Sequence, residues 1–209
     1  MKPILFSTQD VKALLNTKPG TWPAEPIDPG RPCKSQTRRV VKDPPCRLEA
    51  QSSYRYDGTF DDDGCHYVEK LMPNGEPTEK YFNIGKAPYQ VGDKLWVRET
   101  FYDGDMQGKM IYRADGEYDC DGVWKPSIHM PRYAARLFLE VREVRVERLQ
   151  DIRHADVIAE GLQKKECGCE VVTGGYCTVF REFWNAINGK GAWESNPWVF
   201  VYEFMRVEE

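Results

Sequence analysis

The stretch AARLFLEVREVRVERL, residues 134–149, decides the fold. Leu137, Leu139 and Val141 fall at odd positions, whereas Val144 and Val146 fall at even positions. Because successive side chains of a strand point to opposite faces, this change of parity predicts a β-bulge or a sharp bend near Arg142. A bulge of this kind is typical of a sheet that curls into a barrel.

A second stretch, WVFVYEFMRV at residues 198–207, is apolar on both faces except at Glu203 and Arg206. A strand with no polar face is typical of the interior of a sheet, where both faces are covered. We therefore predict a central strand here.

Helices and strands do not alternate regularly along the rest of the chain. Helices are expected where apolar residues recur at helical spacing after a capping residue, such as Ser7 or Thr8, and strands where they alternate. The further strands are expected at 3–6, 95–101 and 109–115. One helix is expected after Ser7 or Thr8. Two more are expected at 151–160 and 178–188, which end at Gly161 and Gly189. The order predicts an α+β fold: a small, curled, mostly antiparallel β-barrel with flanking helices and long loop insertions.

The 209 residues are interpreted as a single domain, 1–209, with insertions at about 43–88 and 163–176. The first insertion is polar, carries an acidic run at 61–63, and has room for a hairpin; we expect it to be mobile.

Composition excludes several classes of protein. With 29 Lys and Arg against 33 Asp and Glu, the net charge is −4, which argues against a general coat for nucleic acid but allows a local basic patch. No apolar run approaches the roughly 20 residues of a membrane helix, so no membrane contact is predicted. The apolar stretch at the N-terminus is too short for a secretory signal. The odd count of seven cysteines indicates reduced thiols in a cytoplasm.

The segment KSQTRRVVK, residues 34–42, is the first candidate for chemistry. If the chain bends after the preceding prolines, Lys34 and Thr37 converge, and a buried lysine can act as general base for a hydroxyl. The alternative is a solvated basic strand edge, or a patch that contacts phosphate.

Glu160 is the second candidate, because it stands at the C-terminal end of its predicted helix. A carboxylate there is mildly unfavourable unless a cation such as Lys34 faces it. The alternative is an exposed surface glutamate.

The segment WKPSIHMPRYAAR, residues 124–136, gathers polar and aromatic groups between two prolines. It suits a pocket for a planar base, with an aromatic ring for stacking and arginine for phosphate. A structural loop explains the same residues equally well.

Cys167, Cys169 and Cys177 are three possible zinc ligands, with Cys120 or the Cys65-His66 pair to complete a site. Their spacing fits no standard Cys-x-x-Cys pair, so free thiols are favoured. We predict no metal and no cofactor.

Four segments together resemble the ASCH domain, a member of the PUA-like superfamily of small β-barrels. They are KSQTRR (34–39), VGDKLWVRE (91–99), DIRHADVIAEGL (151–162) and WVFVYEF (198–204). Residues 124–136 and the C-terminal aromatic segment resemble an ASCH-like group common in bacteriophages and prophages. The resemblance spans nearly the whole chain outside 43–88 and 163–176, and it departs from the family pattern where Ser35 replaces threonine.

One branch of that superfamily hydrolyses N4-acetylcytidine with a Lys–Thr–Glu set, which the resemblance places on Lys34, Thr37 and Glu160. It implies a hydrolase, an amidohydrolase for a modified nucleoside or RNA, located in the cytoplasm (that of the host if phage-encoded). The residues expected to bind substrate are Ser35, Arg39, Arg98, His129, Arg132 and Tyr133.

Two other functions are kept open. The first is a non-catalytic RNA- or DNA-binding module, whose basic face would comprise Lys34, Arg38, Arg39, Lys42 and the arginines of 132–148. The second is a phage accessory protein that binds a host protein. The sequence makes no prediction of oligomeric state.

Overall fold

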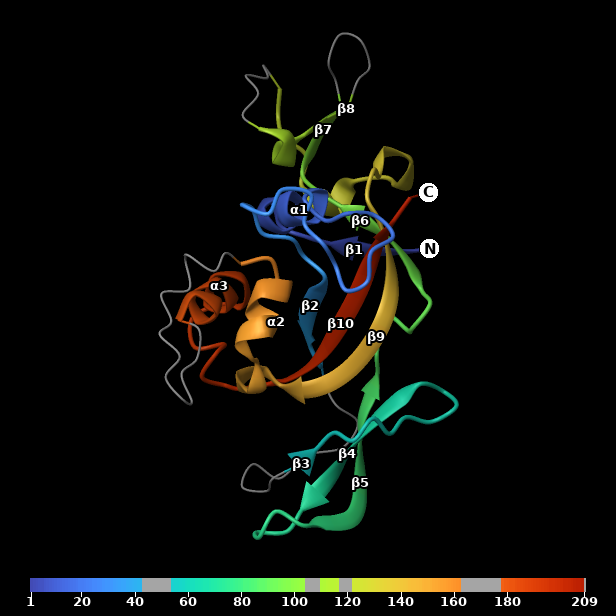
Figure 1. Cartoon of the computed structure of the whole chain (residues 1–209), viewed down its shortest axis with the longest axis vertical. Helices are drawn as coiled ribbons and strands as arrows, with labels where there is room; N and C mark the ends of the chain where they lie inside the picture. Colours follow the sequence, from blue (N-terminus) through green and yellow to red (C-terminus); the bar gives the residue numbers. More distant parts are fainter. Residues whose placement is uncertain (43–53, 104–109, 117–121, 163–177, 209) are drawn as a thin grey trace.

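The computed structural model describes residues 1–42, 54–103, 110–116, 122–162 and 178–208. It has the predicted α+β fold with mostly antiparallel sheets and few helices (Figure 1). The main sheet has the strand order β1-β6-β9-β10-β2. Its strands are β1 (Lys2–Leu5), β6 (Lys94–Arg98), β9 (Phe138–Arg148), β10 (Trp198–Val207) and β2 (Gln36–Val40).

The main sheet is curved but open. Strand β1 pairs with β6 in parallel, and the other neighbours are antiparallel. In the described part of the chain, β1 and β2 are its two edges and do not pair with each other. Closure into the expected barrel therefore stays a prediction.

The bulge predicted near Arg142 is present. Glu203 of β10 lies opposite Glu143, and the next residue, Phe204, lies opposite Val141. Arg142 is therefore the extra residue of β9, and its side chain is exposed. Both long strands arch at the centre of the molecule (Figure 1).

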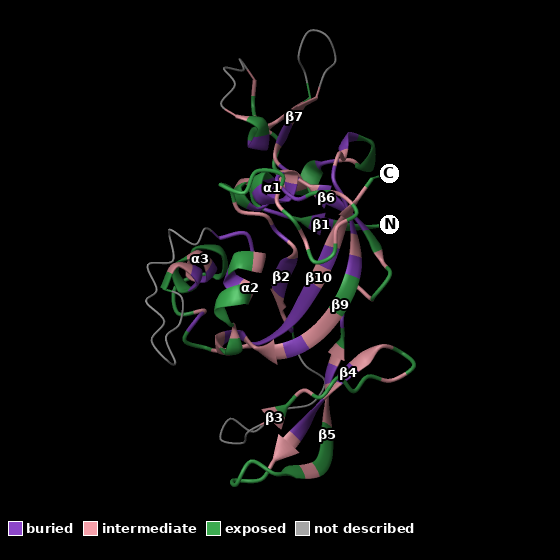
Figure 2. Ribbon diagram, viewed as in Figure 1, coloured by how far each residue is buried: buried purple, intermediate pink, exposed green. Residues whose placement is uncertain are grey.

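Strand β10 is the predicted central strand, with a different apolar cluster on each face. Val199 and Val201 pack on one face with residues of the C-terminal helices, whereas Phe200 and Tyr202 pack on the other with residues of β1 and the first helix. Figure 2 shows β10 as a largely buried strand that runs through the middle of the molecule. A strand buried on two sides needs no polar face, which explains its composition.

Three α-helices flank the sheet: α1 (Thr8–Leu15), α2 (His154–Ala159) and α3 (Thr178–Asn188). Ser7 caps α1, since its hydroxyl accepts from the Asp10 N–H at 3.2 Å while the Asp10 carboxylate accepts from the Ser7 N–H at 3.1 Å. Helix α2 begins later than predicted, because residues Leu149–Asp151 form a 3₁₀ turn instead.

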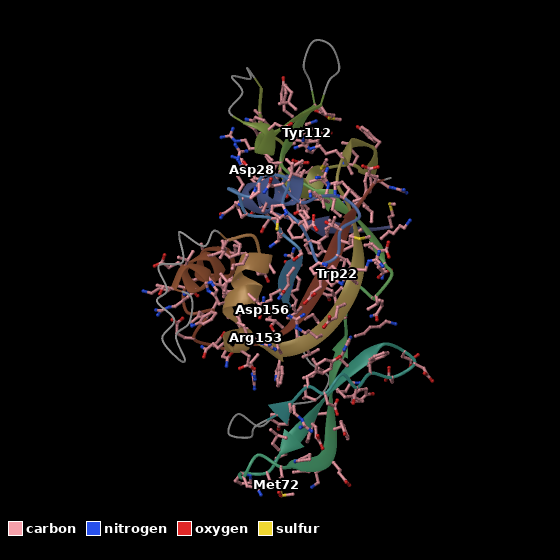
Figure 3. All side chains as sticks on the ribbon, viewed as in Figure 1. Trp22, Asp28, Met72, Tyr112, Arg153 and Asp156 are labelled. Carbon is pink, nitrogen blue, oxygen red and sulfur yellow. The ribbon has the colours of Figure 1, made fainter. Side chains whose placement is uncertain are left out.

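The insertion at 43–88 contains more than the expected hairpin. Strands β3 (Tyr54–Arg55), β4 (Cys65–Leu71) and β5 (Pro77–Lys86) form a three-stranded sheet that projects from the main body, with Met72 at its tip (Figure 3). Val68 and Ile84 join it to the core of the main sheet. Residues 43–53 lie outside the described part, and the mobility expected of the insertion stays a prediction.

The strand expected at 95–101 is divided into β6 and β7 (Phe101–Asp103). Between them the Glu99 side chain is buried and accepts two hydrogen bonds from Arg136, at 2.8 and 2.9 Å. The expected partner strand is β8 (Met110–Tyr112), which ends in a 3₁₀ turn at Arg113–Asp115. The second insertion, 163–176, is outside the described residues.

No helix in the described part of the chain has the length and apolar character that crossing a bilayer requires.

Candidate functional site

A cavity of about 280 Å³ lies beside the edge strand β2, between α1, the end of α2 and α3. We call it the lysine pocket. Its lining residues are Asp10, Lys34, Thr37, Arg38, Arg39, Val40, Lys42, Glu160, Phe180, Phe183, Trp184, Ile187 and Asn188.

Lys34 is a deeply buried charge of the lysine pocket, with 1% of its surface exposed. Its ammonium nitrogen lies 3.0 Å from Asp10 Oδ1, 3.1 Å from Glu160 Oε2 and 2.6 Å from the Glu160 carbonyl oxygen. An ammonium has three N–H donors, and each has an acceptor here. Lys34 is therefore held as a cation between two carboxylates.

Glu160 has the cationic partner that its place at the end of α2 predicts. One carboxylate oxygen binds Lys34, and the other accepts from Arg38 Nη1 at 3.0 Å. Glu160 thus neutralises two buried cations at once, which is the condition for keeping all three in a protein interior.

Gly161 allows α2 to end against Lys34. Its φ of +88° is one that residues with a side chain rarely adopt. A Cβ at this position would lie 2.9 Å from the Ala13 Cβ and 3.3 Å from the Lys34 Cβ. The glycine therefore sets the close approach that brings Glu160 to the ammonium.

Asp10 is a site residue that the sequence identified only as a helix residue. Burial by itself raises the pKa of Asp10, but the charge of Lys34 and hydrogen bonds from Ser7 outweigh it and hold the pKa below its ordinary value. The signal in the sequence was its place three residues after Ser7, where a carboxylate closes a capping box. Its second partner, Lys34, is 24 residues away in sequence and could not be read from that pattern.

Thr37 lines the same cavity as Lys34, and 5% of its surface is exposed. Strand β2 begins only at Gln36, so the alternation of a strand does not extend back to Lys34 and both side chains reach one cavity. In the described residues the Thr37 hydroxyl has no hydrogen-bond partner, whereas each of the three N–H donors of Lys34 has an acceptor.

Arg38 joins the lysine pocket to a larger ion network. Its Nη2 lies 2.5 Å from Glu147 Oε1 on β9 and 3.5 Å from Asp156 Oδ2 on α2, which Figure 3 labels. Arg145 binds the same two carboxylates and Glu203. This network was not predicted, because residue spacing does not show which carboxylates face a buried arginine.

The residues predicted to bind substrate are not all in one place. Arg39 lines the lysine pocket, whereas Arg98 lines a second cavity. Ser35 is in neither lining, and its main chain pairs with Ala159 and Phe204.

The other three belong to short 3₁₀ turns, Ser127–His129 and Arg132–Ala134, outside the lining of the lysine pocket. Tyr133 is 80% exposed there.

Helix α3 supplies the apolar wall of the lysine pocket. Of its residues in the cavity lining, Phe180 and Trp184 are buried and Ile187 is exposed. Flat rings beside a charged cluster suit a planar ligand with polar substituents.

The described residues contain no group of three or more His, Cys, Asp or Glu side chains placed to hold a metal ion. Cys65 is a free thiol, and His66 Nδ1 shares a 2.8 Å hydrogen bond with the Tyr56 hydroxyl. Cys120, Cys167, Cys169 and Cys177 lie outside the described residues.

Comparison of the chain with protein-family models, with curated proteins and with solved structures finds no match.

Proposed function

We propose that the lysine pocket hydrolyses the amide of an N4-acylated cytosine in a nucleoside, as the resemblance to ASCH and PUA-like proteins implies. The observation that carries the proposal is the meeting of three side chains at one cavity: Lys34, Thr37 and Glu160. The aromatic wall of α3 gives the base a surface to lie against.

The three side chains divide the reaction as follows. A water held by the Thr37 hydroxyl attacks the acyl carbon, and its proton passes to Glu160. The Lys34 ammonium turns one N–H from its carboxylate partners to the oxygen of the tetrahedral intermediate. Glu160 returns the proton to N4, the carbon–nitrogen bond breaks, and cytidine and acetate leave.

The hydrogen bonds of Lys34 favour stabilisation of the oxyanion over action as a general base. A general base needs a free lone pair on nitrogen, whereas a cation with three acceptors has none. Stabilising the oxyanion is therefore the role that fits Lys34, and accepting the proton fits Glu160. By the same proposal the enzyme works in a cytoplasm.

The direct test is incubation of the purified chain with N4-acetylcytidine and chromatography of the products. Thr37→Val keeps the shape of the side chain and removes the hydroxyl, so turnover is expected to fall at least about 100-fold. Ser35→Ala is the matched control, since Ser35 is in the same segment but not in the cavity lining.

Absence of cytidine with the wild-type chain would overturn the proposal. Full turnover by Thr37→Val would show that the reaction does not use this hydroxyl. Because the unfolding of both variants is measured in parallel, loss of turnover is separated from loss of folding.

A further inference from the structure

A second cavity of about 610 Å³ lies next to the lysine pocket, between β2, β1 and the end of β5. Four cationic side chains line it: Arg39 and Lys42 after the middle of β2, Lys86 at the end of β5, and Arg98 at the end of β6. Among the residues that the structure describes, its lining contains no aspartate or glutamate. We call it the cationic cavity.

Within the part of the chain that the structure describes, these four cations have no carboxylate partner. Across the described ranges, none of them forms an ion pair, whereas Lys34, Arg38, Arg136 and Arg145 each bind at least one carboxylate. A chain with a net charge of −4 has enough carboxylates to neutralise them. Four cations without a carboxylate partner around one cavity therefore indicate a binding site for an anionic ligand.

The two arginines are held in position without their charge being neutralised. The Arg39 guanidinium lies 5.5 Å from the centre of the Phe6 ring and donates to the Leu5 carbonyl at 2.6 Å. That of Arg98 lies 4.7 Å from the Trp96 ring centre and donates to the Ile128 carbonyl at 3.2 Å. A guanidinium has five N–H donors, so each arginine keeps donors for a ligand.

The cationic cavity is continuous in its lining with the lysine pocket. Arg39, Val40 and Lys42 belong to both. A nucleoside in the lysine pocket would thus have its phosphates next to Arg39 and Lys42, with Lys86 and Arg98 beyond. Tyr89 and Phe200 add aromatic surface to the same cavity, as in sites that bind single strands.

We propose that the cationic cavity binds the phosphodiester backbone of a single-stranded nucleic acid whose base enters the lysine pocket. The placement of the base rests on the proposed function, but the binding of the backbone does not. A polymer fits better than a free nucleotide, because the four cations come from three separate segments of the chain and a polymer offers several phosphates to them.

This proposal replaces the basic face considered from the sequence. Of the residues expected there, Lys34, Arg38 and Arg145 are neutralised by carboxylates. Arg39 and Lys42 of that face line the cationic cavity, and Lys86 joins them from the insertion.

The test is binding of a short, unmodified, cytidine-rich RNA to the full chain, followed by fluorescence anisotropy at several salt concentrations. With four phosphate contacts, the logarithm of the association constant is expected to fall with the logarithm of salt with a slope of about −3. Lys86→Gln removes one contact, which reduces the slope by about 0.7 and weakens binding about eightfold at about 50 mM salt.

Lys80→Gln is the matched control, because Lys80 is an exposed lysine of the same strand that is not in the cavity lining. Lys42→Gln combined with Lys86→Gln is expected to weaken binding about 60-fold at the same salt. Both lysines are exposed, so these variants are expected to fold normally.

Equal weakening by the Lys80 and Lys86 variants would overturn the proposal, as would the absence of salt-dependent binding. If cytidine monophosphate binds as tightly as the RNA, the ligand is not a polymer. If an acidic peptide binds as tightly as the RNA, the site is not specific for nucleic acid. None of these readouts needs turnover, so a failure of the hydrolase proposal leaves the result interpretable.

Discussion

The lysine pocket and the cationic cavity share Arg39, Val40 and Lys42, but the cations that belong to only one of them differ in burial and in their ion partners. In the lysine pocket, Lys34 and Arg38 are buried and bind Asp10 and Glu160. In the cationic cavity, Lys42 and Lys86 are exposed and bind no carboxylate of the described residues. A buried cation needs a counter-ion from the protein itself, whereas a cation at a cavity mouth stays hydrated until a ligand arrives.

The largest effect expected from this difference is on Glu160. Glu160→Ala leaves Lys34 and Arg38 buried with fewer partners, which is expected to lower the free energy of unfolding by about 3–5 kcal/mol. The matching change in the other cavity, Lys86→Ala, removes an exposed charge and is expected to alter it by less than about 0.5 kcal/mol. Urea unfolding of both variants measures the contrast, and equal effects would show that the two groups of cations do not differ in this way.

The second prediction concerns the close approach at Gly161. Gly161→Ala introduces strain from the positive φ and a contact with Ala13, and is expected to lower the free energy of unfolding by about 2–3 kcal/mol. Gly189→Ala is the control, because its φ of +98° is similar but no atom lies within 4 Å of the added Cβ. Its expected cost is about 1 kcal/mol from the backbone alone. If both variants unfold alike, the approach of α2 to Lys34 is not tightly packed.

The third prediction is an acid sensitivity that comes from Asp10. Its pKa is lowered in the folded chain, so the unfolded chain takes up the proton first as the pH falls. The stability that Asp10 contributes is complete above its ordinary pKa of 3.8 and is lost below it, as the pH falls through the folded value. Asp10→Asn is therefore expected to have a lower free energy of unfolding at neutral pH. Its free energy of unfolding is also expected to fall less steeply than that of the wild type between about pH 5 and 3. Urea titrations at several pH values measure this, and parallel curves for the two proteins would contradict it.

The fourth prediction is a small effect on stability at Thr37. Its hydroxyl has no hydrogen-bond partner in the described residues, so Thr37→Val is expected to change the free energy of unfolding by less than about 1 kcal/mol. A small change in stability together with a large loss of turnover is the combination that the proposed function requires. A loss above about 2 kcal/mol would instead give the hydroxyl a structural role.

The main features of the fold were predicted because they depend on local pattern. The change of parity around Arg142 and the apolar faces of β10 are both visible in the order of residue types. The meeting of Lys34 and Thr37 followed from a bend after the prolines, and the partner of Glu160 from its place at a helix end. Their catalytic roles stay predictions.

The remaining features of the two cavities depend on distant parts of the chain. Lys86 and Arg98 reach the cationic cavity from β5 and β6, and no spacing in the sequence shows that these strands end beside β2. The ion partners of Arg38 come from β9 and α2 in the same way. Free charge around a cavity is visible only once all neighbours of each cation are known.

The ion network around Glu160 has a consequence for how the molecule opens. Alternating charges run through α1, β2, the end of α2, β9 and β10, by way of Asp10, Lys34, Glu160, Arg38, Glu147, Arg145 and Glu203. None of these elements can separate without exposing an unpaired charge, so their amide hydrogens are expected to exchange with solvent as one cooperative unit. The projecting sheet of β3, β4 and β5 has no residue in that chain of charges, so its amide hydrogens are expected to exchange before those of the network.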